Sequence, residues 1–423
     1  MSVSPETTSK PNPIAQYAAA ESSAGAALKE TARTAAEALR EATVALSHAI
    51  HAEPETAYQE FKTADKLVAY IEGQGFTVER GVADLDTAFT ATKGTGELVI
   101  GICSEMDALP EVGHACAHNM IGSSGVLAAA VLGGLADELG ITVKLFGTPA
   151  EELGAGKVFM LERGAFDGVH AAMMVHPGTD EESRHFTRAI NDYEVLYHGK
   201  TAHSAGAPWN GINAGDAVTV AQVAIGLLRQ HLRPGNLLHG IVTKAGEAPN
   251  IVPGESSMYY NGRANTMEEL EELKLRLFKC FEAGATATGC SFEIKEDWPA
   301  YSEFRNDYPF SATYQRNAEA LGRTFDNADE AYLKEKAGST DMANISLLIP
   351  TIHPSVRLNA GGAGNHQPEF AAYTVTEEAD EAMWESGLAM AWTAIDLALD
   401  PQQRERLLST RIDHTTETGV AHS

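Results

Sequence analysis

The chain has 423 residues, 44% of them hydrophobic, and this length favours two domains over a single core. Its 31 Lys and Arg against 58 Asp and Glu give a formal net charge of −27, which argues against nucleic acid and against a membrane surface as partners. Four cysteines are too few for a disulfide scaffold, and neither a membrane-spanning apolar run nor the apolar part of a secretory signal is present. We therefore expect a protein of the reducing cytoplasm.

The first half of the chain alternates between helical and strand patterns. Apolar spacing predicts helices over residues 28–50, 61–71, 120–139 and 156–163, and strands over residues 97–103, 141–146 and 171–175. This alternation indicates a doubly wound, mixed α/β sheet, in which ligands bind beyond the carboxyl ends of the strands. We expect residues 1–24 to be disordered or frayed, and residues 401–423 to be a polar, dispensable C-terminal tail.

The order of elements changes near residue 189. Strands are predicted over residues 190–197, 238–244, 255–264 and 291–296, with helices over residues 212–232 and 266–289. The order β-α-β-β-α-β is that of a ferredoxin-like module. We predict that residues 189–297 form an inserted domain, because helices near residues 309–321 and 375–399 continue the earlier pattern. Residues 25–188 and 298–400 would then form a discontinuous catalytic domain.

A cysteine and a histidine, Cys116 and His118, stand two residues apart in a loop before an apolar helix. A thiolate and an imidazole suit zinc, cobalt or manganese as ligands. Taken alone the pair is weak, because cysteine is often simply a buried residue. Whether the pair binds metal therefore depends on which other candidate ligands the fold brings near it.

Polar residues follow three predicted strands. Glu105 and Asp107 follow the first strand, the pair Glu151-Glu152 follows the second, and His176 follows the third. One of two adjacent carboxylates can bind metal while the other acts as general base, and Asp107 can orient a metal-bound histidine. A solvated surface pair, a core histidine and a turn-capping acid are the alternative interpretations.

A glycine-rich segment near the C-terminus contains His366, which local sequence alone would leave as a loop residue. Together with the strand-end residues it completes a set of five candidate ligands, and a bridging thiolate or water would then suffice for two metal ions. The set is Cys116, His118, Glu152, His176 and His366.

Nine motifs, in this order, resemble the aminoacylase and carboxypeptidase family of di-metal metallopeptidases. The resemblance is strongest to the subgroup of auxin-conjugate hydrolases, aminobenzoyl-glutamate hydrolases and Xaa-Lys-type dipeptidases, and it runs from about His48 to Leu399. The motifs are His51-Ala-Glu-Pro-Glu55, Glu105-Met-Asp-Ala-Leu-Pro110, Gly113-His-Ala-Cys-Ala-His-Asn119, Thr148-Pro-Ala-Glu-Glu152, His176-Pro177, His203-Ser-Ala205 with Pro208, Asn250-Ile-Val-Pro253, Gly338-Ser-Thr-Asp341 and Asn365-His366.

The resemblance implies a metal arrangement. Cys116 would bridge two divalent metal ions, zinc in the first place, with manganese or cobalt as alternatives. Glu152 and His366 would complete the coordination of one ion, and His118 and His176 that of the other.

The resemblance also implies catalytic and binding roles. Glu151 would be the general base and acid, and Asp107 would orient a ligand. The inserted domain would be a lid that forms a homodimer, so that His203 reaches the neighbouring subunit's site and stabilises the oxyanion. Asn250 and Arg263 would hold the substrate, for which the guanidinium offers bidentate binding of a carboxylate.

Two positions depart from the family pattern: Ala117 stands where relatives carry glycine, and Glu105 where they commonly carry aspartate. The change at Ala117 could alter the backbone angles of the loop but removes no ligand, and the effect of Glu105 stays open. The predicted substrate is a small amide: an N-acyl amino acid, an aminobenzoyl-glutamate-like compound or a dipeptide. A hydrolase with Cys116 as nucleophile and a non-catalytic binding or scaffold protein are the alternatives.

Overall fold

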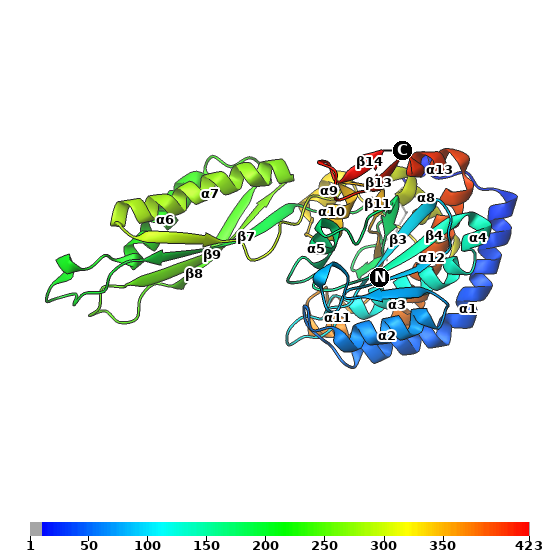
Figure 1. Ribbon diagram of the computed structural model, residues 1–423, viewed down its shortest axis with the longest axis horizontal. Coiled ribbons are helices and arrows are strands. Elements are labelled where there is room, and N and C mark those ends of the chain that lie inside the picture. The colour runs from blue at the N-terminus through cyan, green and yellow to red at the C-terminus, as the bar shows by residue number, and fades with distance from the viewer. Residues whose placement is uncertain (1–10, 423) are drawn as a thin grey trace, which may run out of the picture. The chain divides into compact units, whose positions relative to one another are not determined.

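The structure is a computed structural model that describes residues 11–422. The chain forms two compact units. One comprises the chain up to Phe186 and again from Phe304 onwards, and the other comprises Thr187–Glu303 (Figure 1). We predicted the boundaries of the inserted unit at residues 189 and 297.

The first unit is built on a six-stranded mixed sheet with the order β1-β2-β4-β3-β5-β11. The strands β4, β3, β5 and β11 run parallel, whereas β1 and β2 are antiparallel additions at one edge. Their bounds are β1 Thr77–Arg80, β2 Phe89–Lys93, β3 Leu98–Glu105, β4 Ile141–Thr148, β5 Ala171–Met173 and β11 Thr351–Ile352.

Helices cover both faces of this sheet because its strands are apolar on both sides. Ile100 and Ile102 of β3 belong to the larger core, which includes residues of α1, α2, α3 and α12, whereas Cys103 belongs to a second core with α5 and α10. The bounds are α1 Ser23–His51, α2 Phe61–Glu72, α3 His118–Gly133, α5 Gly156–Glu162, α10 Met342–Ser346 and α12 Glu377–Leu399.

The remaining elements of this unit are short or lie at its margins. The strands β6 and β12 pair in parallel, and β13 and β14 form an antiparallel pair. The bounds are η1 Ala15–Tyr17, η2 Val82–Asp84, α4 Ala136–Leu139, β6 His176–Gly178, α8 Tyr308–Ala320, α9 Glu330–Glu335, β12 Ser355–Arg357, α11 Pro368–Tyr373, α13 Pro401–Leu408, β13 Thr410–Ile412 and β14 Val420–His422.

Both ends of the chain differ from the predicted frayed N-terminal segment and polar C-terminal tail. Within residues 11–24, Ile14 and Ala19 are buried and α1 begins at Ser23; the prediction for residues 1–10 lies outside the described residues. The predicted tail forms α13 and the β13–β14 pair, with Leu407 and Ile412 buried. Few apolar side chains anchor this segment, which is why its composition resembles that of a solvated tail.

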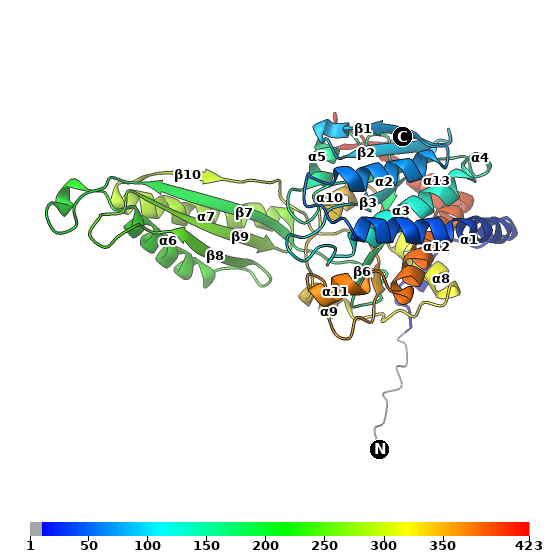
Figure 2. The same ribbon diagram turned by 90° about the horizontal axis from the view of Figure 1, so that it is seen from below.

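The inserted unit has the predicted order β-α-β-β-α-β. Its strands form an antiparallel sheet with the order β10-β7-β9-β8, and α6 and α7 pack against each other and against β9 (Figure 2). The bounds are β7 Ala189–His198, η3 Pro208–Asn210, α6 Ala214–Arg229, β8 Leu237–Lys244, β9 Glu255–Ala264, α7 Met267–Thr288 and β10 Ser291–Lys295. The fold class, a mixed α/β domain with a ferredoxin-like insertion, is confirmed.

No helix among residues 11–422 combines the length and the apolar character that crossing a membrane requires.

Candidate metal centre

The polar segments meet at the carboxyl edge of the parallel strands. Glu105 is the last residue of β3 and pairs with Thr148, the last residue of β4. His176 is the third residue after the end of β5. The loop that holds Cys116 leads into α3, which packs against β3 and β4. The sheet register therefore gathers residues that are far apart in the sequence.

All five predicted ligands lie together within the first unit. The ligand atoms of Cys116, His118 and His176 lie within 4.8 Å of one another, and so do those of Cys116, Glu152 and His366. Cys116 Sγ is 3.5 Å from His176 Nε2, and His366 Nε2 is 3.5 Å from Glu152 Oε2. Cys116 is common to both triplets, which is the position that a bridging ligand requires.

The orientation of the side chains fits divalent metal binding. The Nδ1–H group of His118 donates to Asp107 Oδ1 at 3.1 Å, and that of His176 donates to the carbonyl oxygen of Pro177 at 2.7 Å. In the neutral form of each ring, Nε2 is then the nitrogen with a free electron pair. Among the described residues, the buried atoms His118 Nε2 and Glu152 Oε1 have no hydrogen-bond partner. Buried polar atoms rarely stay unpaired, and a metal ion would satisfy both.

Asp107 connects two parts of the site. Its Oδ1 accepts the backbone N–H of Glu151 at 3.1 Å in addition to the His118 bond, and its Oδ2 accepts the backbone N–H of Glu152 at 2.9 Å. Burial opposes ionisation of Asp107, but the charge that His118 carries when it is protonated and these hydrogen bonds outweigh burial and lower the pKa of the carboxyl. Asp107 therefore remains a charged acceptor that orients both segments.

The loop between β4 and α5, which carries Glu151 and Glu152, has a constrained backbone. Ala150 and Ala155 adopt left-handed backbone angles, with φ of 56° and 57°. Such angles are costly for a residue with a Cβ atom, so the surroundings must hold them. The buried Glu60 does so by accepting the backbone N–H of Ala150 at 3.0 Å, and Tyr58 Oη donates to the carbonyl oxygen of Gly154 at 2.5 Å.

Glu151 has the surroundings of a proton acceptor. Glu151 is 7% exposed, and one of its carboxylate oxygens lies within 4.8 Å of ligand atoms of His118 and Glu152. Burial raises the pKa of Glu151 well above its ordinary value, and repulsion from Glu105 and Glu152 raises it further. A general base must accept a proton readily, which a raised pKa favours.

The departure at Ala117 has a visible backbone consequence. Ala117 caps the N-terminus of α3 with φ of 64°, in the left-handed region that glycine adopts without strain. A residue with a Cβ atom there costs roughly 1–2 kcal/mol, and the buried packing around its methyl group opposes that cost. The helix still begins at His118, so the ligand keeps its place.

Sequence reasoning missed one charged residue beside the site, Lys157 on α5. It is fully buried, and its Nζ lies 2.6 Å from Glu105 Oε1 and 2.6 Å from Asp341 Oδ1. Glu105 Oε2 in turn lies 3.4 Å from His118 Nε2. A lone lysine in the apolar run Lys-Val-Phe-Met-Leu is the signal that would have indicated it.

The three predicted lid residues, His203, Asn250 and Arg263, belong to the inserted unit, so the metal ligands assemble without them. His203 is exposed and pairs with Ile251 in an isolated β-bridge, while Arg263 is half-buried on β9. The Nδ1 atom of His203 accepts the backbone N–H groups of Ala205 and Gly206, at 3.2 and 3.0 Å. Its Nε2 therefore carries the proton in the neutral ring and can donate.

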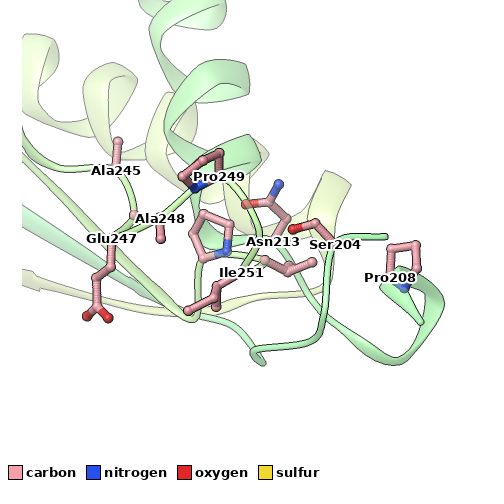
Figure 3. Close-up of a pocket in the computed structure, with 11 residues that line it drawn as sticks. Ser204, Pro208, Asn213, Ala245, Glu247, Ala248, Pro249 and Ile251 are labelled. Atoms are coloured by element: carbon pink, nitrogen blue, oxygen red, sulfur yellow. The ribbon is translucent and has the colours of Figure 1, made fainter. Parts of the chain in front are cut away.

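A pocket of about 580 Å³ lies on the inserted unit beside the segments that hold His203 and Asn250. Figure 3 shows Ser204, next in sequence to His203, and Ile251, next to Asn250, in its wall together with Pro208 and Asn213. The segments that hold His203 and Asn250 thus border a hollow on their own unit, whereas Arg263, near the C-terminal end of β9, is not among the residues that line it.

The fold is that of a metal-dependent peptidase. The chain matches peptidase family M20/M25/M40 over residues 101–389 and belongs to that family. It is an enzyme that hydrolyses carbon–nitrogen amide bonds, and the resemblance found in its sequence is confirmed.

Two curated relatives and one solved structure show the extent of the likeness. The Xaa-Arg dipeptidase of Mus musculus is 35% identical over 396 residues, which cover 90% of this chain and 91% of the relative. One of the subunits of the p-aminobenzoyl-glutamate hydrolase of Escherichia coli is 32% identical over 66% of this chain and 63% of its own. The Bacillus subtilis dinuclear metal-binding peptidase of this family matches in fold, with a TM-score of 0.62, 24% identity, and coverage of 84% of this chain and 98% of that one.

Proposed function

We propose that this chain is a two-metal dipeptidase that hydrolyses the amide bond before a C-terminal basic amino acid. The observation that carries the proposal is the convergence of Cys116, His118, Glu152, His176 and His366, two of which, His118 and Glu152, also lie within 4.8 Å of Glu151. When bound, two divalent ions would polarise the substrate carbonyl and lower the pKa of a water molecule towards neutrality. Zinc is the proposed metal, because one thiolate, three imidazoles and one carboxylate suit it.

The protein's own residues then handle protons and geometry. Glu151 takes a proton from the attacking water and returns it to the leaving amine nitrogen. Asp107 keeps the His118 ring oriented and holds the backbone of the Glu151 loop. His203 would donate from Nε2 to the developing oxyanion, which agrees with its tautomer, and Asn250 and Arg263 would bind the substrate's amide and carboxylate.

Two observations favour a basic substrate. The mouse and human relatives that match over 90% and 85% of this chain are Xaa-Arg dipeptidases. The net charge of −27 attracts a cationic dipeptide and repels an anionic aryl amide of glutamate at long range. The Escherichia coli hydrolase supports aminobenzoyl-glutamate as the second candidate substrate.

The inserted unit supports a homodimer as the working form. Its sheet ends at β8, whose second edge is unpaired within the described chain, and Ile241 on this strand is 65% exposed. On α6, Val223 and Leu227 are 61% and 68% exposed. An open strand edge beside exposed apolar side chains is suited to pairing with a second copy. Light scattering on wild type and Ile241→Asp tests this, and a monomeric wild type would contradict it.

The decisive experiment is a substrate panel with metal analysis. The purified protein is assayed on dipeptides ending in Arg or Lys, on aminobenzoyl-glutamate and on N-acetyl amino acids, before and after chelation. We expect turnover of the basic dipeptides, loss with a chelator and recovery with zinc. Faster turnover of aminobenzoyl-glutamate than of the basic dipeptides would contradict the proposed substrate and favour aminobenzoyl-glutamate instead.

The same assay separates the metal mechanism from one with a cysteine nucleophile. Burial raises the pKa of the Cys116 thiol, which opposes a reactive thiolate in the absence of metal. Activity that resists chelation but is lost on alkylation would overturn the metal mechanism.

A further inference from the structure

A buried charge cluster lies beside the general base. Carboxylate oxygens of Glu105, Glu151 and Asp341 lie within 4.8 Å of one another, and all three residues are buried. Lys157 Nζ lies 2.6 Å from both Glu105 Oε1 and Asp341 Oδ1. Three carboxylates so close together cannot all stay ionised away from water without a compensating cation.

Lys157 supplies that cation permanently. Burial opposes its charge, but Asp341 and Glu105 outweigh the effect of burial, so the pKa of the ammonium lies well above its ordinary value. Asp341 also accepts the backbone N–H of Lys157 through Oδ2 at 2.8 Å. Lys157 is therefore bound to the cluster through both its side chain and its backbone.

Lys157 also stands at the base of the loop that carries Glu151. This loop closes on itself, since the backbone N–H of Gly156 donates to the carbonyl oxygen of Ala150. A Cβ atom on Gly156 would lie 1.9 Å from the carbonyl oxygen of Pro149, so the closure is tight. Lys157 is held by Glu105 on β3 and by Asp341 beside α10. These two bonds therefore hold the C-terminal end of the Glu151 loop in place.

We propose that Lys157 is a positioning residue for catalysis, which holds Glu151 in place by neutralising Glu105 and Asp341 and by anchoring the end of the Glu151 loop. This inference rests on the proposed function. The side chain of Lys157 bonds to Glu105 and Asp341, which are not among the five metal ligands. Glu105 Oε2 lies 3.4 Å from His118 Nε2, so metal content is the measurement that separates an effect on the base from an effect on the metal ligands. A displacement of a catalytic group by about 1 Å can cost on the order of 100-fold in rate.

The test compares three variants in the full-length, metal-loaded protein. Lys157→Met removes the charge with little change in length. The double variant Glu105→Gln/Lys157→Met restores the net charge of the cluster but not the anchor. Lys144→Met is the matched control, because this half-buried lysine donates to the carbonyl oxygen of Ala165 away from the cluster. Metal content, melting temperature, kcat and KM are measured for each on the dipeptide that wild type hydrolyses.

We expect Lys157→Met to keep both ions and a KM within threefold of wild type while kcat falls about 100-fold. The double variant should have a higher kcat than Lys157→Met, but one at least tenfold below wild type. The control should keep a kcat within twofold of wild type. A merely structural role would lower the melting temperature or the metal content without this selective loss of kcat.

Three results would overturn the inference. The first is a loss of kcat below tenfold in folded, metal-loaded Lys157→Met. The others are a loss of kcat that metal addition reverses, or an equal loss of kcat in Lys144→Met. If Lys157→Met does not fold, the double variant decides, and a loss below tenfold overturns the inference. Wild-type turnover is measured first. Its absence would refute the proposed substrate, whereas turnover that is insensitive to Lys157 would refute only this inference.

Discussion

Asp107 accepts the backbone N–H of Glu152 at 2.9 Å through the same carboxylate that accepts the Nδ1–H of His118 at 3.1 Å. One buried acid therefore links a ligand at the start of α3 with a ligand in the loop after β4. The two ligands are 34 positions apart in the chain, and their relative position depends on this link. A change at Asp107 should therefore affect the whole centre.

The substitution Asp107→Asn should weaken metal binding. An asparagine side chain presents an NH₂ group to one of the N–H donors that Asp107 now satisfies, so at least one buried hydrogen bond becomes a donor–donor contact. We expect metal affinity to fall about 10–100-fold, as is usual when a residue that orients a ligand is lost. Competition with a chromophoric chelator measures this. Asp65→Asn, at an exposed ion pair with Arg80, is the control, and an affinity for Asp107→Asn equal to that of the control would contradict the role.

The substitution Glu151→Gln should separate metal binding from catalysis. The amide keeps the size of the side chain but cannot take a proton, so the ions should stay bound while kcat falls roughly 10³-fold. Glu162→Gln, at the exposed end of α5, is the matched control and should leave kcat unchanged. Metal content by mass spectrometry and initial rates on the same preparations give both quantities. Near-full activity of Glu151→Gln would end the assignment of Glu151 as the base.

The strands that carry the site could be predicted because their signals are local. The predicted strands over residues 97–103 and 141–146 correspond to β3 and β4, and the polar residues that follow each one lie at the sheet edge. The ligand set needed the family resemblance as well, since His366 sits in a loop without periodicity. Its backbone N–H donates to the carbonyl oxygen of Ala115, a contact 251 positions away that no local pattern encodes.

Other features escaped prediction because they depend on distant partners or on very short elements. Lys157 pairs with carboxylates 52 and 184 positions away, so its role emerges only in the folded chain. The strand β11 has two residues, Thr351 and Ile352, too few to show a period of two. The outer strand of the sheet, β1 at Thr77–Arg80, is mostly exposed and carries no apolar alternation.

The C-terminal helix should contribute to stability, in contrast to the dispensable tail that composition suggested. Leu407 on α13 is fully buried, and the neighbouring Arg404 donates to the carbonyl oxygen of Gly140 at 2.7 Å. Leu407→Ala should lower the free energy of unfolding by about 2–5 kcal/mol, the usual range for a cavity in a core. Leu275→Ala, at a side chain that is 58% exposed, should change it by less than about 0.5 kcal/mol. Urea unfolding measures both, and equal effects would show that α13 is not part of the core.

Glu60, which supports the Glu151 loop, should make stability depend on pH. Burial, with repulsion from Asp107, raises the pKa of Glu60 to about 7 from an ordinary 4.5, despite hydrogen bonds from Thr87 and Ala150 that lower it. Between these values the folded state binds more protons than the unfolded state, so the stability contributed by protonated Glu60 is complete below about pH 4.5. That contribution is lost as the pH rises through 7, and it amounts to roughly 3 kcal/mol by pH 8.

The substitution Glu60→Gln tests this dependence, because glutamine keeps an oxygen for the N–H of Ala150 and does not ionise. The loss of unfolding free energy between pH 5 and pH 8 should be smaller in Glu60→Gln than in wild type by about 2–3 kcal/mol. Comparing the two proteins under identical conditions cancels the titration of the other groups, including the metal ligands. Glu72→Gln, at the end of α2, serves as the control and should leave the wild-type pH dependence unchanged. Parallel pH profiles for Glu60→Gln and wild type would mean that Glu60 is ionised throughout this range, held as a carboxylate by its three donors Tyr58 N–H, Ala150 N–H and Thr87 Oγ1–H.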